Sequence, residues 1–191
     1  MPIRRRIACF AGVGVIAALP AAGLAHETPL PEPRPMDQMQ GPCSDFAMDI
    51  EREAAAWASP AVASVTAATA RSEAPEIVPG AVVPVALHPH PEVEFDVAPE
   101  KDRGTPDKFS GHVRVTLPEA GLWRVAASNG LWFDAVVGGA IVPSAAFEMQ
   151  TQCSAPFKVV VFDLPAGPVD LQFNGSPAPE VQVMVLPWAP R

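Results

Sequence analysis

The hydrophobic pattern changes its period along the chain. Between residues 44 and 58, apolar residues recur at helical spacing, namely Phe46, Ile50, Ala54 and Trp57. Ser44, a residue type that caps helices, precedes this stripe, and Pro60 follows it. The pattern predicts one amphipathic helix over residues 44–58, with its apolar face packed against a larger structure.

After residue 80 the period becomes two, which is typical of half-buried strands. In residues 92–97, valine and phenylalanine alternate with carboxylates. Further predicted strands are 111–117, 122–127, 131–137, 157–164, 169–173 and 181–186. Gly138–Gly139 suits a tight hairpin turn between two of them. Seven or eight short strands with proline and glycine turns predict a mainly β fold, an antiparallel sandwich or jelly roll.

Two segments of this β region resemble each other. Residues 115–121 (VTLPEAG) lead into a strand that ends at Asn129–Gly130, and residues 161–167 (VFDLPAG) lead into one that ends at Asn174–Gly175. The repetition predicts two equivalent hairpins, one in each half of a sandwich. Because proline and glycine are frequent in this chain, chance repetition of turn chemistry is the alternative.

Residues 1–25 have the composition of a secretory signal peptide. A basic start at residues 4–6 is followed by an apolar run over 7–19 and by small residues up to Ala25. This run is shorter than the roughly 20 residues of a membrane anchor. We expect cleavage after Ala25 and a periplasmic or secreted product that is not inserted in a membrane. Residues 26–42 are rich in proline and predict an extended tail, and 43–191 a single domain.

Charge and cysteine content restrict the partners and the compartment. Removing residues 1–25 takes away three arginines and no acid, so the net charge falls from −8 to −11. An acidic chain of this kind is not expected to bind nucleic acid or anionic membranes. Cys9 leaves with the signal peptide, and the remaining pair, Cys43 and Cys153, predicts a disulfide that ties the helix to the sandwich.

Two stretches carry a resemblance to known proteins. The segments FSGHVRVTLPEAGLWRVAAS and VVVFDLPAGPVDLQFNGSPAPEVQVMV look like bacterial pre-peptidase C-terminal (PPC-like) domains, which are small β-sandwiches attached to secreted enzymes. The chain also resembles small exported proteobacterial proteins of unknown function, through Cys43, Trp57, Trp132-Phe133-Asp134, Cys153 and Pro165-Ala166-Gly167. These are turn and packing motifs, so the resemblance implies a β-sandwich rather than an activity.

A histidine-rich stretch is the strongest candidate for chemistry. Its potential metal ligands are His88, His90 and Glu94, with His112 as a fourth. Their spacing resembles the first cupin motif, H-x-H-x3-E, and would suit iron or copper in a dioxygenase. Pro89 and Pro91 disrupt a ladder strand, strand parity sends Glu94 toward solvent, and the second cupin motif is absent. Surface histidines beside an edge strand are therefore the favoured interpretation.

Other candidate sites are secondary. Trp123 and Trp132 could stack on a sugar or another ligand, although tryptophans of a sandwich more often lie in the core. After cleavage His26 would offer an amino-terminal copper chelate, and the acidic loop 100–107 could bind calcium. No G-x-S-x-G nucleophile motif occurs. We therefore expect a non-catalytic binding or accessory module without a cofactor, whose partner is an envelope protein or polysaccharide. A metal-binding dioxygenase is the alternative.

Overall fold

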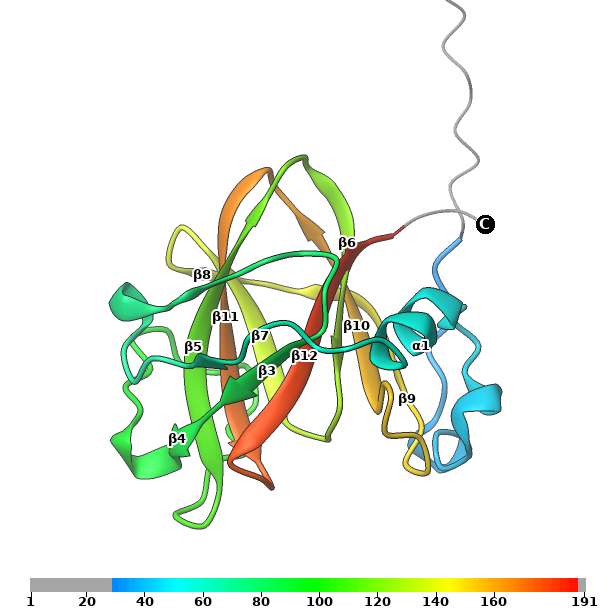
Figure 1. Ribbon diagram of the computed structural model, residues 1–191, viewed down its shortest axis with the longest axis horizontal. Coiled ribbons are helices and arrows are strands. Elements are labelled where there is room, and N and C mark those ends of the chain that lie inside the picture. The colour runs from blue at the N-terminus through cyan, green and yellow to red at the C-terminus, as the bar shows by residue number, and fades with distance from the viewer. Residues whose placement is uncertain (1–28, 189–191) are drawn as a thin grey trace, which may run out of the picture.

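A computed structural model describes residues 29–188, which form a sandwich of two sheets (Figure 1). The predicted signal peptide and His26 lie outside the described residues. One sheet has the order β1 (Val65–Thr66), β3 (Val83–Ala86), β12 (Glu180–Pro187), β6 (Gly121–Ala127), β10 (Lys158–Leu164) and β9 (Ser144–Met149). The other has the order β2 (Glu76–Ile77), β5 (Phe109–Leu117), β11 (Gly167–Ser176), β7 (Trp132–Val137) and β8 (Ala140–Val142), and β4 (His88–Pro89) pairs with β5.

The pairing is antiparallel except for two short contacts. β1 pairs with β3 and β2 pairs with β5 in parallel, and every other strand pair is antiparallel. The predicted mainly β sandwich is confirmed. The turn at Gly138–Gly139 joins β7 to β8, and both glycines have positive φ, as a tight hairpin of this kind needs.

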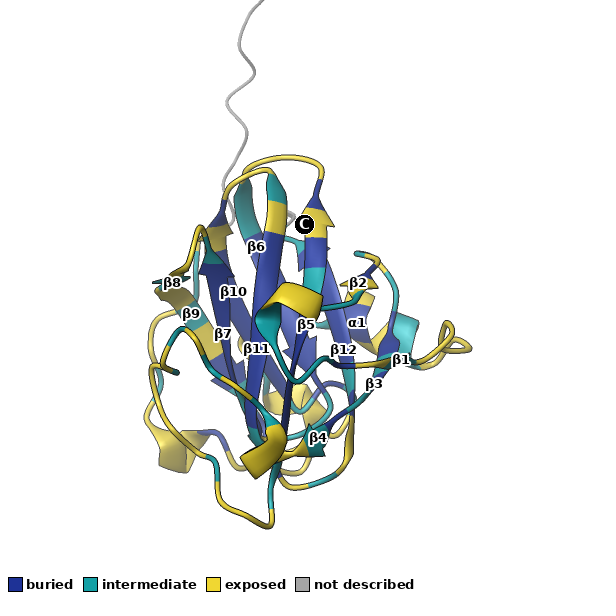
Figure 2. Cartoon of the chain, turned by 90° about the vertical axis from the view of Figure 1, so that its left-hand side faces the viewer, coloured by how far each residue is buried: buried dark blue, intermediate teal, exposed yellow. Residues whose placement is uncertain are grey.

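The main core lies between the two sheets and is built by the alternation predicted from the sequence. Val113 and Val115 of β5 belong to the same buried cluster as Val183 and Val185 of β12, and all four are at most 1% exposed. Figure 2 shows buried residues along the strands of both sheets and exposed residues in the connections. Burying one such side chain contributes about 1.5–3 kcal/mol, so this layer is the main source of stability.

The two Leu-Pro segments are equivalent, but they are not hairpins. Each crosses from one sheet to the other: residues 117–121 link β5 to β6, and residues 164–167 link β10 to β11. Leu117 pairs with Gly167 in one sheet, and Gly121 pairs with Leu164 in the other, so the two crossings stack reciprocally. Gly121 and Gly167 have φ values of 146° and 105°, which other residues rarely adopt.

The Asn-Gly pairs that follow these crossings differ from each other, contrary to the predicted equivalence. Asn129–Gly130 lies in the connection from β6 to β7, whereas Asn174–Gly175 lies inside β11. There the pairing register with β5 shifts between Phe173 and Ser176, so the glycine accommodates an irregularity rather than a turn.

The helix covers the outer face of the sheet that contains β6, β10 and β12. A second apolar cluster forms there, with Val159 and Val161 of β10 packed against Met48, Ile50 and other residues of the amino-terminal segment. The helix α1 spans Glu51–Trp57, which is shorter than the predicted 44–58. It begins late because the backbone of Phe46 is extended, and the amides of Ala47 and Met48 that follow donate to the carboxylate of Glu148.

The amino-terminal segment is fixed to the edge strand β9 and its following turn. The disulfide between Cys43 and Cys153 is present, as predicted. Two short 3-10 helices, η1 (Met36–Gln38) and η2 (Cys43–Asp45), precede α1. Residues 29–42 are not a loose tail: Met39 is 1% exposed, and its carbonyl accepts a hydrogen bond from Thr151.

Two other predictions about local structure were wrong or incomplete. Residues 92–97 are not a strand; η4 (His90–Glu92) is a 3-10 helix, and the chain beyond it is irregular. The backbone amides of Val93 and Glu94 donate to the carbonyls of His90 and Thr69, so this segment is bonded to turns and loops instead of to a neighbouring strand. The strand β9 and the short strands before β5 were not predicted, and η3 (Arg71–Glu73) is a further 3-10 turn. No helix within residues 29–188 is long and apolar enough to cross a membrane.

Candidate functional site

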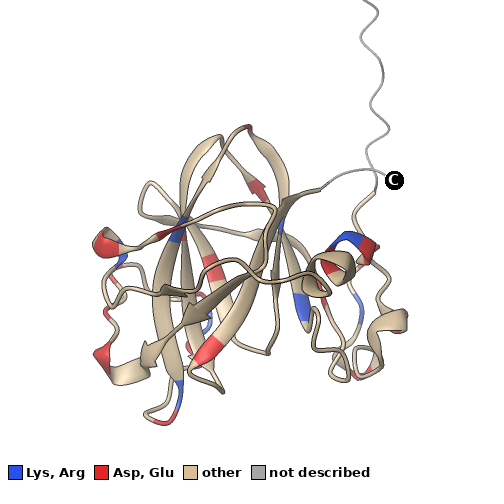
Figure 3. Ribbon diagram, viewed as in Figure 1, with Lys and Arg blue, Asp and Glu red and all other residues tan. Residues whose placement is uncertain are grey.

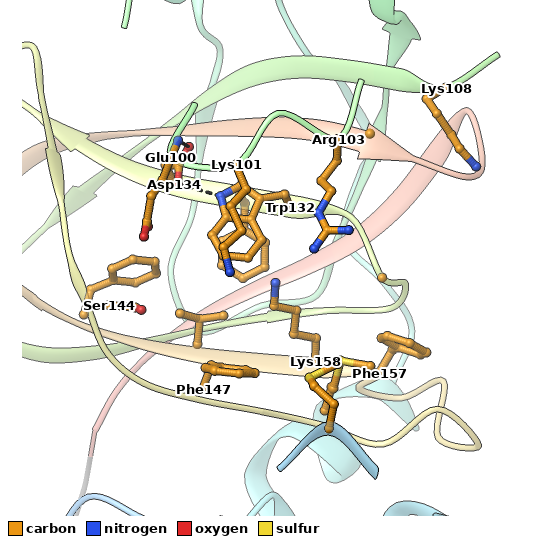
Figure 4. A pocket seen from close by; sticks show the side chains of 17 residues that line it. Glu100, Lys101, Arg103, Lys108, Trp132, Asp134, Ser144, Phe147, Phe157 and Lys158 are labelled. Atoms are coloured by element: carbon orange, nitrogen blue, oxygen red, sulfur yellow. Dashed lines mark hydrogen bonds between the residues drawn. The ribbon is translucent and has the colours of Figure 1, made fainter. Parts of the chain in front are cut away.

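A pocket of about 510 Å³ opens at one edge of the sandwich (Figure 4). Its walls are β9 and β10 of one sheet, β7 of the other, and the segment 100–108 that precedes β5. The apolar part of the lining consists of Met36, Trp132, Phe133, Phe147, Met149, Phe157, Val160 and Phe162. Met36 is 55% and Phe147 39% exposed, so the rim presents apolar surface to solvent. This volume lies within the range of pockets that hold small organic ligands.

Four of the nine lysine and arginine side chains within residues 29–188 line this pocket. Lys101, Lys108 and Lys158 are the only lysines in the sequence, and all three line the pocket together with Arg103. Figure 3 shows that most of the ribbon is formed by uncharged residues, with the charged residues scattered along it.

These four cations differ from most arginines elsewhere in the structure. Within residues 29–188, none of the four has a carboxylate oxygen within 4.0 Å. The arginines that do form ion pairs with Asp or Glu are Arg34, Arg71, Arg114 and Arg124. The lining also includes the carboxylates of Glu100 and Asp134, so four cations face two anions and the pocket has an excess of positive charge, which favours anions.

Lys158 is placed in the pocket wall by strand alternation. It lies two and four residues before Val160 and Phe162, so its side chain enters the space between the sheets on the core face of β10. Only 7% of the residue is exposed. Its ammonium donates one long hydrogen bond, 3.4 Å to the carbonyl oxygen of Leu131. Burial lowers the pKa of Lys158 to about 8, although Asp134 opposes this shift.

Trp132 lies between the cations and the polar face of β7. The Nζ atoms of Lys101 and Lys158 are each 4.7 Å from the centre of its ring, and Lys158 is also 4.9 Å from that of Phe133. The indole N–H donates to Asp134 at 2.8 Å. These contacts fix the ring as a flat wall of the pocket, and cation–π attraction stabilises both ammonium groups there.

A buried polar row supports this wall from the outer face of the same sheet. His112, Gln172 and Asp134 are cross-strand neighbours on β5, β11 and β7. Each is at most 2% exposed, and Gln172 donates to Asp134 at 2.9 Å. The backbone amide of Glu100 also donates to Asp134, which attaches the segment 100–108 to the sheet. Burial lowers the pKa of His112, so its ring is neutral at neutral pH.

The histidines named by the sequence lie on the same side of this sheet, but each has its own partner. His88 is hydrogen-bonded to the Ala67 carbonyl at 2.8 Å, and His90 to the Ser110 hydroxyl at 2.9 Å. His112 is hydrogen-bonded to the backbone carbonyl of Glu94, whose side chain is exposed. No group of three His, Cys, Asp or Glu within the described chain is arranged to hold a metal ion. His112 points to the outer face of β5, yet it is fully buried because the segment around Glu94 and Phe95 covers it.

The two tryptophans proposed for ligand stacking are separated by the fold. Trp123 is 3% exposed in the main core, and its N–H donates to the carbonyl of Glu119, so it is not accessible to a ligand. Trp132 is half-buried and lines the pocket. Lys158 was missed by the sequence analysis, although a lysine in phase with Val160 and Phe162 is a signal that could have identified it.

Comparisons with known proteins do not assign this site. No family model matches the chain, and no curated protein matches it either.

Proposed function

We propose that this protein is a non-catalytic binding module for a small organic anion with an apolar body. The observation that carries the proposal is the convergence of all three lysines and Arg103 on one partly apolar pocket in an otherwise acidic chain. The carboxylate, sulfonate or phosphate group of the ligand would lie near Lys101, Arg103 and Lys158. Its apolar body would contact Trp132 and the phenylalanines of the lining.

The energetics of Lys158 support an anionic ligand. A buried ammonium with one long hydrogen bond has lost much of its hydration, and a ligand anion would replace that hydration with a charge-assisted bond. The exposed Lys101 and Arg103 would attract the ligand from solvent. The affinity would fall as pH rises through about 8, because Lys158 then loses its charge.

We further propose that the module works outside the cytoplasm, in the periplasm or as a secreted protein. The disulfide between Cys43 and Cys153 supports this location, since such bonds persist in oxidising compartments. The two stacked Leu-Pro crossings are compatible with a PPC-like sandwich, whose members accompany other secreted proteins. The bound anion would then be a component or metabolite of the cell envelope.

Binding of 8-anilinonaphthalene-1-sulfonate tests the proposal, because this probe combines a sulfonate with aromatic rings and fluoresces in apolar sites. We expect saturable binding at one site by the folded mature protein, weakened about tenfold or more by Lys158→Met and severalfold by Lys101→Met. Arg52→Met is the matched control. It removes an exposed cation on α1, away from the pocket, and should leave binding unchanged.

Two results would overturn the proposal. One is equal affinity in the wild-type protein and in both lysine variants. The other is equal loss of affinity in Arg52→Met, which would indicate attraction by general charge rather than by the pocket. Lys101 is exposed, so its variant gives a clear result even if Lys158→Met alters packing.

A further inference from the structure

The amine of Lys158 has the surroundings of a nucleophile rather than of a structural cation. An ammonium has three N–H donors, and here one of them reaches a single carbonyl oxygen at 3.4 Å. Its other neighbours are the faces of Trp132 and Phe133. Within the described residues no carboxylate lies within ion-pair distance of its Nζ. The Trp132 and Phe133 rings and the more distant Asp134 favour the protonated form, but burial outweighs them and lowers the pKa of Lys158.

The same amine is open to the pocket. Figure 4 shows the Lys158 side chain extending from β10 into the cavity, toward Trp132, with Arg103 above it and Phe147 and Phe157 beside it. A ligand whose carboxylate meets Lys101 or Arg103 would place its neighbouring atoms close to the Lys158 nitrogen. Burial and the nearby cations Arg103 and Lys101 lower the pKa of Lys158 to about 8, so a useful fraction is neutral near neutral pH.

We propose that Lys158 captures anionic carbonyl compounds, such as oxo acids or carboxylated aldehydes, as a covalent imine in this pocket. The amine nitrogen attacks the carbonyl carbon, a C–N bond forms, and the electron pair of the C=O π bond moves to oxygen. The resulting carbinolamine loses its oxygen as water, which carries away both amine hydrogens and leaves a C=N bond. No oxidant or reductant is required. The inference rests on the proposed anion site and narrows its ligand to the carbonyl class.

Reductive trapping with 4-carboxybenzaldehyde and sodium cyanoborohydride tests this inference. The mature protein is treated at pH 7.5, and the modified residues are identified by peptide mass spectrometry. Lys101 and Lys108 serve as internal controls in the same molecule. We expect Lys158 to be modified about tenfold faster than either, because burial lowers its pKa to about 8 and leaves part of it as the neutral, nucleophilic amine at this pH. Benzaldehyde, which lacks the carboxylate, should react with Lys158 more slowly.

Two variants separate imine formation from anion binding. Lys158→Arg keeps a cation but cannot form an imine, so it should bind the fluorescent sulfonate and gain no adduct at this position. Lys101→Met should slow adduct formation at Lys158 without changing the rate at Lys108.

The outcomes distinguish this inference from the proposed function. 4-Methylbenzoate, which has no electrophilic carbonyl, is tested for displacement of the fluorescent sulfonate. Displacement without selective modification of Lys158 would overturn the imine and leave the anion site standing. Selective modification of Lys158, equal for benzaldehyde and its carboxylate, would overturn the anion site and leave the reactive amine. Modification of Lys101 or Lys108 at the rate of Lys158 would contradict the inference directly.

Discussion

Replacement of Lys158 by methionine should stabilise the protein. The side chain is 7% exposed and its pKa falls from 10.5 to about 8, so folding forces a charged group into a poorly solvating site. This fall corresponds to about 3 kcal/mol at neutral pH, since each pKa unit is worth about 1.4 kcal/mol. Methionine has a similar length and no charge. It loses the cation–π contacts, worth about 0.5–2 kcal/mol, so the expected net gain is about 1–3 kcal/mol.

The sign of the pH dependence follows from the lowered pKa. Between about pH 8 and 10.5 the unfolded chain binds a proton at Lys158 that the folded protein does not. The wild-type free energy of unfolding, relative to that of the variant, should therefore rise with pH across this window. The advantage of Lys158→Met should be complete below pH 8 and disappear near pH 10.5.

Urea unfolding at pH 7, 8.5 and 10, followed by tryptophan fluorescence, measures this difference. Lys108→Met is the control: it removes a partly exposed lysine of the same pocket and should change stability by about 0.5 kcal/mol or less. A variant Lys158→Met that is less stable than wild type at pH 7, or a stability difference that does not vary with pH, would refute the reasoning.

Three further predictions concern the amino-terminal part of the chain: its disulfide, its contact with Glu148 and its cleavage. Reduction of the Cys43–Cys153 bond, which closes a sequence separation of 110 residues, should lower the free energy of unfolding by about 4–5 kcal/mol, and thiol titration of the unreduced, denatured mature protein should find no free thiol. Glu148→Gln should lower the free energy of unfolding by about 1–3 kcal/mol, because an NH2 group replaces one carboxylate oxygen and cannot accept from the backbone amides. Hydrogen exchange should then accelerate at residues 47 and 48. Amino-terminal sequencing of exported protein should begin at His26, and a product that retains residues 4–6 would contradict the predicted cleavage.

Local alternation predicted the strands well because each inner side chain must meet the opposite sheet. Val113, Val115 and Leu117 take one face of β5, as the sequence indicates, and they are all buried. The same pattern failed at residues 92–97, where the amides of Val93 and Glu94 donate to His90 and Thr69 and no strand within residues 29–188 pairs with the segment. Alternation shows that one face is apolar, but it does not show whether a ladder partner is available.

Long-range partners could not be predicted from local sequence. The helix starts at Glu51 because Glu148, which lies in β9, binds the backbone amides that a longer helix would need. The Leu-Pro-x-Gly signal identifies a turn, yet it does not say whether the next strand returns to the same sheet. In this fold both Leu-Pro segments, before Gly121 and Gly167, change sheets, and that choice depends on the pairing of β5 with β11 and of β6 with β10.

The site was partly visible in the sequence and partly not. Trp132 was a candidate because a tryptophan ring can stack on a ligand, and the structure places it in the pocket wall. The histidines drew attention through their spacing, but spacing along an irregular segment does not determine where the rings point. The convergence of Lys101 and Lys158 could not be derived, because it depends on how the segment 100–108 folds over β7.

Lys158 lowers the stability of the folded protein and is also the proposed anion-binding group. Both properties arise because its ammonium loses hydration on folding. If the lysine were only a packing residue, Lys158→Met would raise stability and leave the pocket's ligand binding unchanged. If it is the anion-binding group, the same substitution should raise stability and remove binding together. A gain in stability with loss of binding is the pattern expected when a site maintains an unfavourable charge for function. Measuring both quantities on one variant therefore separates a structural lysine from a functional one.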